Sequence, residues 1–208
     1  MTADEPVYLM GFDLGQSADY TALAIAERKE VPSGKLSRTG RPETKAHYGV
    51  RHLRRFRLGT SYPVIVDQVA ELAANPALGS PILVVDATGV GAPVFDLLDE
   101  RVLDSPVIGV TITGGDSVTH ESRHYGVPKR DLICSLNVLL QTKRLRFARA
   151  MPAAEVLRQE RQAFRVKLSS AAHDTYGAGR ENVHDDLVIA VALACWYGEN
   201  CYVRQLIR

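Results

Sequence analysis

Short apolar segments separated by polar turns fill the first part of the chain, and this spacing is typical of strands. Residues 7–13 (VYLMGFD) and 20–28 (YTALAIAER) flank the polar turn LGQSAD and predict a β-hairpin. Residues 46–57 (AHYGVRHLRRFR) predict a third strand, and the polar stretch 29–45 before it predicts a loop or a hairpin tip. The chain is therefore expected to open with three consecutive antiparallel strands.

Segments with helical spacing then alternate with short apolar runs. In chain order the predicted elements are a helix over 62–75 capped by Ser61, a strand over 82–85, a helix over 92–103, a strand over 106–112, a loop over 113–127, a helix that Pro128 starts, a strand over 144–147, a helix that Pro152 starts, a strand over 164–169 and a helix over 185–197. The unbroken run ILVV is typical of a buried parallel strand. The last helix lacks a polar face and should be buried. The pattern predicts an α/β fold with a mixed central sheet, three antiparallel strands and then parallel strands, flanked by helices.

Length and composition are those of one folded domain. Of the 208 residues, 46% are hydrophobic and 24% are charged, which is far from the composition of a disordered chain. The net charge of +1 means that affinity for a polyanion must come from local clusters of basic residues. The three cysteines form no metal or disulfide pattern, and the sequence shows neither a secretion signal nor a membrane span. We therefore expect a single domain over residues 1–208 in the cytosol.

Acidic residues at the ends of apolar segments are the candidate chemistry. Asp13 follows VYLMGF, Asp86 follows ILVV, and the pair Asp185 and Asp186 precedes LVIAVALA. A carboxylate beside a buried segment is costly unless it has a partner, and a divalent metal is a common partner. If the first and fourth strands are neighbours and the last helix packs across them, these carboxylates meet at one end of the sheet. Their hard oxygen atoms suit Mg²⁺ or Mn²⁺.

Each acid also has a plain structural interpretation. Asp13 could start the hairpin turn, and Asp86 could cap the turn ATGVG that follows it. Asp185 and Asp186 could be ordinary residues at a helix start, where the helix dipole favours negative charge. From the residues alone, both interpretations stay open.

Basic residues are concentrated between residues 120 and 167, where eleven Lys and Arg stand against four Asp and Glu. Solvated helix faces explain any single one of them, whereas contact with a DNA phosphate backbone explains the segment equally well. Arg51, Arg54, Arg55 and Arg57 form a second cluster, which fits an exposed strand face. The residues predicted to contact DNA are Arg123, Lys129, Arg130, Lys143, Arg144, Arg146 and Arg149.

Four segments extend in order from about Tyr8 to Trp196: GFDLGQSADYTALAIAE, LVVDATGVGAPVFDLL, VPKRDLICSLNVLL and HDDLVIAVALA. Together they resemble the nuclease domain of large terminase subunits, the viral DNA-packaging proteins. That family has an RNase H-like fold related to Holliday-junction resolvases, with three acidic positions that bind two metal ions. The resemblance implies that Asp13, Asp86 and Asp186 hold two Mg²⁺ or Mn²⁺ ions. Asp186 is preferred because a resolvase-like D-x-x-x-A pattern starts there; the neighbouring Asp185 fits a helix cap better and is the alternative ligand.

The resemblance also implies a function. The protein would be an endonuclease that cuts concatemeric viral DNA with little regard to sequence, by two-metal-ion hydrolysis, during genome packaging. Its partners would be double-stranded DNA and the packaging ATPase, small terminase and portal proteins, in the cytoplasm of an infected bacterium. No G-x-x-x-x-G-K-[ST] motif occurs, so we expect no packaging ATPase domain in this chain.

Three rival functions remain open. A junction resolvase would share the acidic site, act on branched DNA and form a dimer. An ATP-binding protein of the actin-like class, a sugar kinase or chaperone, has phosphate loops that resemble GFDLG and VVDATGVG, but it needs two such lobes. A catalytically silent packaging or DNA-binding module would not need the acidic residues.

Overall fold

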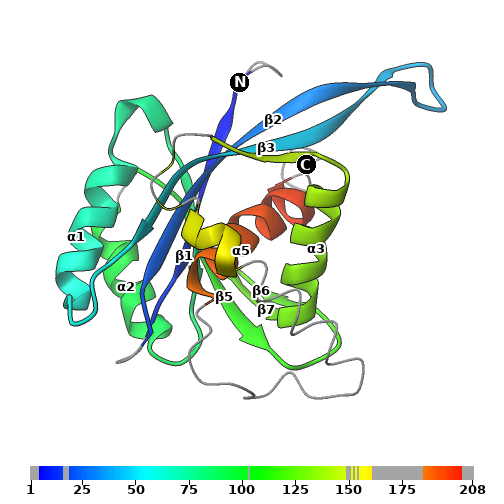
Figure 1. Cartoon of the computed structure of the whole chain (residues 1–208). Helices are drawn as coiled ribbons and strands as arrows, with labels where there is room; N and C mark the ends of the chain where they lie inside the picture. The colour runs from blue at the N-terminus through cyan, green and yellow to red at the C-terminus, as the bar shows by residue number, and fades with distance from the viewer. Residues whose placement is uncertain are drawn as a thin grey trace.

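The computed structural model describes residues 5–15, 19–102, 104–148, 151, 153, 155–160 and 185–202. Figure 1 shows the arrangement of the elements along the chain. The elements are β1 (Val7–Asp13), β2 (Ala22–Leu36), β3 (Pro42–Arg55), α1 (Tyr62–Ala73), a 3-10 turn (Pro76–Leu78), β4 (Ile82–Asp86), α2 (Gly91–Arg101), β5 (Val107–Thr113), β6 (Thr119–Glu121), β7 (His124–Pro128), α3 (Lys129–Gln141), β8 (Leu145–Phe147) and α5 (Asp186–Asn200).

The strands form one mixed sheet in the order β6-β7-β5-β4-β1-β2-β3-β8. Strands β1, β2 and β3 are consecutive and antiparallel. Strand β4 returns beside β1 and is parallel to it, and β5 and β7 continue the parallel part. This topology confirms the predicted fold class, three antiparallel strands followed by parallel ones. It also makes β1 and β4 neighbours that end on the same side of the sheet.

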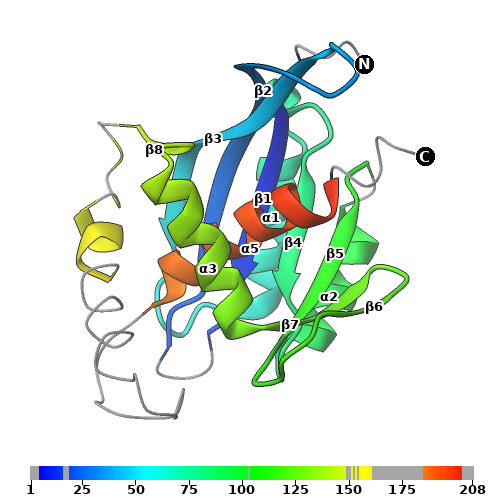
Figure 2. The same ribbon diagram turned by 90° about the vertical axis from the view of Figure 1, so that its right-hand side faces the viewer.

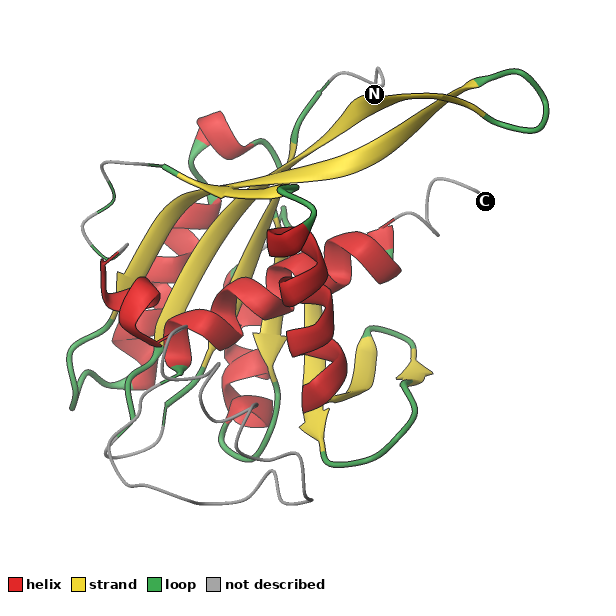
Figure 3. Ribbon diagram, turned by 45° about the vertical axis from the view of Figure 1, so that its right-hand side comes forward, coloured by secondary structure: helices red, strands yellow, loops and turns green. Residues whose placement is uncertain are grey.

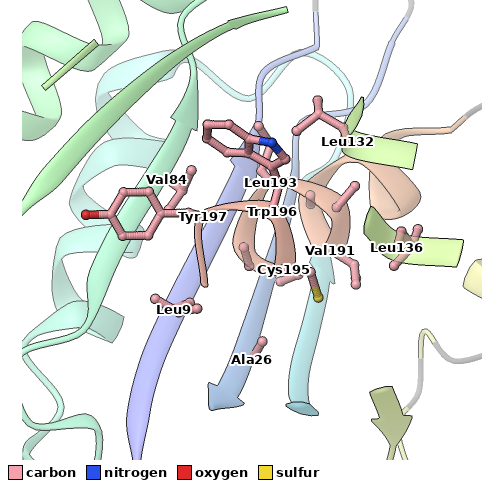
Figure 4. Close-up of a cluster of buried hydrophobic side chains, with 14 of the residues drawn as sticks. Leu9, Ala26, Val84, Leu132, Leu136, Val191, Leu193, Cys195, Trp196 and Tyr197 are labelled. Atoms are coloured by element: carbon pink, nitrogen blue, oxygen red, sulfur yellow. The ribbon is translucent and has the colours of Figure 1, made fainter. Parts of the chain in front are cut away.

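Helices cover both faces of the sheet, with α3 and α5 on one face and α1 and α2 on the other (Figure 2). Alternate residues of a strand point to opposite faces, so Leu9 packs beneath α5 whereas Met10 packs against the α1 side. Every residue of α5 from Asp186 to Gly198 is buried, which confirms the burial predicted from its missing polar face. In Figure 4, Tyr197 of α5 lies beside Val84 of β4, whereas Leu132 and Leu136 of α3 lie on the opposite side of α5.

Two polar segments contain more strand than predicted: 29–45, predicted as a loop or hairpin tip, and 113–127, predicted as a loop. Residues 29–45 extend β2 and β3 into a long ribbon that projects beyond the rest of the sheet (Figure 3). Its turn is closed by the N–H of Ser37, which donates to the Arg41 carbonyl at 2.8 Å. Residues 113–127 likewise contain β6 and most of β7. Polarity was misleading here because both hairpins are largely exposed, so their strands need backbone pairing but few apolar side chains.

Helix α1 begins at Tyr62, as predicted, but two details of the predicted helix starts differ. Pro128 precedes α3 with an extended backbone and is not its first helical residue. Ser61 lies at the cap position of α1, but its side chain makes no capping hydrogen bond. The predicted start of a helix at Pro152 and the predicted strand over 164–169 lie outside the described residues. Among the described residues, no helix is long and apolar enough to cross a membrane.

Candidate active site

Strands β1 and β4 bring Asp13 and Asp86 together. The two strands are paired in parallel register up to Phe12 and Val85, and the next residue of each strand is the aspartate. Asp86 is buried, and its Oδ1 accepts a hydrogen bond from the Thr88 N–H at 2.8 Å. The turn after Asp86 is tight because a Cβ at Gly91 would lie 1.9 Å from the Asp86 carbonyl oxygen. The two carboxyl groups therefore meet at the end of the sheet.

Helix α5 carries the other two aspartates to the same end. It can pack directly on β1 because Gly11 has no side chain: a Cβ there would lie 1.9 Å from the carbonyl oxygen of Ala190. This close approach places the first turn of α5 near the end of β1. We call Asp13, Asp86, Asp185 and Asp186 the acidic end of the sheet.

Electrostatics show how crowded the acidic end is. The pKa of Asp13 is raised well above its ordinary value of 3.8, first by burial and then by repulsion from Asp86, Asp186 and Asp185. Burial also raises the pKa of Asp86, although hydrogen bonds from Thr88 and Asp13 oppose the rise. Asp13 therefore retains its proton more readily and can share it with Asp86. A positive ion at this place would relieve the repulsion.

Lys129 supplies one positive charge to the acidic end. Its Nζ lies 3.0 Å from Asp185 Oδ2, and its charge lowers the pKa of both Asp13 and Asp86. Asp185 lies at the cap position of α5, as predicted, but its side chain makes no capping hydrogen bond. Lys129 was predicted as a DNA contact, and the structure places it among the carboxylates.

Two residues of this region were not among the predicted site residues. Glu160 is buried, and its Oε2 accepts hydrogen bonds from the N–H groups of Leu187 and Val188, both at 3.1 Å. Arg55 forms an ion pair with Glu160 and lies 3.1 Å from Asp186 Oδ2. Burial raises the pKa of Glu160 to about 7, although Arg55 and the two amides oppose this. No local sequence signal marks Glu160, because its partners lie in distant segments.

Within the described ranges, no three acidic, histidine or cysteine side chains already lie close enough together to hold a metal ion. The donor chemistry nevertheless fits a divalent cation. Carboxylate oxygens are the ligands that Mg²⁺ and Mn²⁺ prefer, and burial followed by mutual repulsion raises the pKa of Asp13. A bound cation would stabilise the ionised carboxylates and remove that conflict.

The basic residues predicted to contact DNA are spread over the molecule. Lys129 and Arg130 begin α3 at the acidic end, whereas Lys143, Arg144 and Arg146 follow the end of this helix of 13 residues, about 20 Å away. Arg144 binds Glu199, in the last turn of α5, and only 15% of its side chain is exposed. Arg123 precedes β7 and pairs with Asp99. Arg149 lies outside the described residues.

The second basic cluster, on β3, is not the uniformly exposed strand face that its sequence suggests. Arg51 and Arg54 bind Glu27 and Gln68 respectively. Arg55 turns inward to Glu160, and 23% of its side chain is exposed.

Comparisons with known proteins identify the fold. No protein-family model and no curated protein matches the sequence. The large terminase nuclease of the thermophilic phage G20c is similar in structure, with a TM-score of 0.53 and 18% sequence identity, over 94% of this chain and 83% of that one. The manganese-soaked terminase nuclease domain of human cytomegalovirus gives a TM-score of 0.51 and 13% identity, over 96% of this chain and 86% of that one. The manganese-soaked, inhibitor-bound form of the same domain gives a TM-score of 0.54 and 12% identity, over 94% of this chain and 85% of that one.

This protein therefore has a terminase nuclease-like fold of the RNase H-like class. The fold predicted from its sequence motifs is confirmed.

Proposed function

We propose that the protein is a metal-dependent DNA endonuclease of the terminase nuclease type. The observation that carries the proposal is the convergence of Asp13, Asp86 and Asp186 at the acidic end, where burial and then repulsion by its neighbours raise the pKa of Asp13. A terminase nuclease-like fold with a carboxylate cluster of this kind is suited to hold divalent cations against a DNA phosphate.

Each residue has a distinct part in this proposal. The charges of Asp86 and Asp186 both raise the pKa of Asp13, so Asp13 lies close to both carboxylates. In this proposal Asp13 would be shared by the two cations, and Asp86 and Asp186 would each hold one. Two bound cations would activate a water molecule and stabilise the leaving 3′ oxygen of the phosphodiester. Lys129, whose ammonium group lies beside Asp185, would limit repulsion between the carboxylates and the approaching phosphate.

The biological setting is part of the same proposal. The substrate would be concatemeric viral DNA, cut with little regard to sequence during genome packaging in the cytoplasm of an infected bacterium. The packaging ATPase, small terminase and portal proteins would then be the partners. The proposal rests on the terminase nuclease-like fold together with the basic residues of the 120–167 segment.

Digestion of supercoiled plasmid DNA tests the proposal. We expect nicking and linearisation with Mg²⁺ or Mn²⁺ and no cleavage with Ca²⁺ or EDTA. Asp13→Asn should abolish cleavage while the protein stays folded, because the amide keeps the shape but loses the negative charge that a shared cation requires. Nicking by folded Asp13→Asn at the rate of the unmodified protein would contradict the proposal. A strong preference for four-way junctions over plasmid would favour a resolvase.

A further inference from the structure

Glu160 caps the helix that carries Asp186. The first N–H groups of a helix have no partner within the helix, and the first such bond of α5 runs from Ile189 N–H to the Asp185 carbonyl at 2.9 Å. Leu187 and Val188 precede that bond, and both donate their N–H groups to Glu160 Oε2 at 3.1 Å. A side chain from a distant part of the chain therefore binds the turn directly after Asp186.

Arg55 connects Glu160 to the Asp186 carboxylate. One guanidinium nitrogen, Nη2, contacts Glu160 Oε1 and lies 3.1 Å from Asp186 Oδ2. The guanidinium carbon also lies 4.6 Å from the centre of the Tyr20 ring, which covers the group. In the sheet, Arg55 pairs with Ala22, and Ala22 pairs with Asp13, so β3 ends level with the acidic end.

This arrangement is more than a cap for stability. A Ser, Thr or Asp at the start of α5 could cap it locally, and Asp185 is present there but binds Lys129 instead. Burying Glu160, which is 5% exposed, costs desolvation energy that an exposed local cap avoids. The long-range cap leaves the side chains of Asp185 and Asp186 available to the acidic end. It also connects the first turn of α5 to β3, because Glu160 binds Arg55.

We propose that Glu160 and Arg55 are positioning residues of the nuclease site. Glu160 fixes the first turn of α5, and Arg55 orients the Asp186 carboxylate toward a divalent cation shared with Asp13. Neither residue contacts substrate in this inference, which rests on the proposed nuclease function. Removing such an outer partner of a metal ligand typically weakens metal affinity by about 10-fold to 100-fold.

Binding of Mn²⁺ to the whole chain without DNA, followed by electron paramagnetic resonance, tests the inference. Glu160→Ala should weaken Mn²⁺ binding at least about tenfold. Glu160→Gln keeps an oxygen that accepts the α5 amides, so it should restore part of the affinity. Glu155→Gln is the matched control, because Glu155 belongs to the same helical stretch, 155–160, but is exposed. Its ion pair is with Arg158, in the same stretch.

A double variant separates positioning from general damage. If Glu160 acts through Asp186, the variant with both Glu160→Ala and Asp186→Asn should bind Mn²⁺ as weakly as Asp186→Asn alone. Additive losses would overturn the inference. If Glu160→Ala does not fold, Glu160→Gln and Arg55→Lys take its place, and Mn²⁺ affinities within about twofold of the unmodified protein in both would overturn the inference.

The two proposals fail in different ways. If the unmodified protein binds no Mn²⁺, or if Asp13→Asn binds Mn²⁺ as tightly as the unmodified protein, the proposed function fails and the inference fails with it. If Mn²⁺ binds and Asp13→Asn abolishes binding, but Glu160→Ala binds normally, only the inference fails.

Discussion

Four aspartates and one lysine define the acidic end, and their neighbours separate their roles. Asp185 binds Lys129 at 3.0 Å, whereas Asp186 lies 3.1 Å from Arg55. The two adjacent carboxylates of α5 therefore face different partners. Of these two carboxylates, only Asp186 is buried.

Exchanging these two aspartates for asparagine, one at a time, tests which one is the ligand. We expect Asp186→Asn to be inactive in plasmid cleavage, because it loses a charged ligand oxygen at the buried position. Asp185→Asn should keep part of the activity, because it loses only the ion pair to Lys129. Mn²⁺-supported cleavage by both folded variants is the measurement. The reverse order of activities would assign the ligand to Asp185.

The raised pKa of Asp13 predicts how stability depends on pH. Asp13 and Glu160 bind their protons more tightly in the folded chain than in the unfolded one, with ordinary values of 3.8 and 4.5 respectively. Without metal, the contribution of these two groups to the free energy of unfolding should therefore be most favourable at low pH and fall as the pH rises from about 4 to about 7. Mn²⁺ should raise it again at neutral pH, because a bound cation stabilises the ionised carboxylates.

Urea unfolding at several pH values measures this dependence. Asp13→Asn should flatten the fall, since it removes the group with the largest conflict. Asp67→Asn, which removes a largely exposed carboxylate paired with Arg101, is the control and should leave the slope unchanged. The same pH dependence in Asp13→Asn as in the unmodified, metal-free protein would contradict a raised pKa at Asp13.

At the scale of elements, the contact between α5 and β1 decides whether the aspartates meet. The contact depends on Gly11, where β1 passes directly under the Ala190 carbonyl. Because the obstructing atom is backbone, a rotamer change cannot make room for a side chain. Helix α5 would have to move away from the sheet.

Gly11→Ala should therefore destabilise the protein by about 1–3 kcal/mol or more and weaken Mn²⁺ binding. The matched control is Gly114→Ala, because a Cβ at Gly114 meets nothing within 4 Å. Thermal unfolding and Mn²⁺ titration of both variants measure the effect. Equal melting temperatures for the two variants would show that α5 does not depend on this contact.

At the scale of the whole molecule, the basic residues around α3 fall into two groups. Lys129 and Arg130 lie at the acidic end, while Arg144 and Arg146 lie beyond the far end of the helix. Under the proposed function, a DNA phosphate bound at the acidic end would lie closer to the first group than to the second. Arg144, already bound to Glu199, is less available.

Neutralising each group as a pair tests where DNA lies. Changing Lys129 and Arg130 to glutamine should weaken duplex binding and flatten its salt dependence, by about 0.9 in the slope of log affinity against log salt for each lost phosphate contact. The same change at Arg144 and Arg146 should have a smaller effect. Titrations of unrelated duplexes in Ca²⁺, at several salt concentrations, measure both. A larger loss from the Arg144 and Arg146 pair would move the DNA path to the other end of α3.

Local patterns were sufficient for much of the fold. The apolar runs that end at Asp13 and Asp86, and the helix without a polar face after Asp186, are readable because burial of apolar side chains leaves a periodic trace in the sequence. The order of these segments was enough to predict a mixed sheet, with three antiparallel strands followed by parallel ones. The sequence did not predict how far β2 and β3 extend into the ribbon, since an exposed hairpin is held by backbone pairing and leaves no apolar period.

The sequence by itself determined the strands that end in acids, the buried last helix and the resemblance that names their fold. Only the tertiary structure decided that Lys129 binds Asp185, that Glu160 caps α5 and that Arg55 turns inward to join Glu160 and Asp186. The physical reason is distance along the chain. Burial and periodicity are properties of neighbouring residues, whereas an ion pair or a long-range cap exists only after folding brings separate segments within hydrogen-bonding distance.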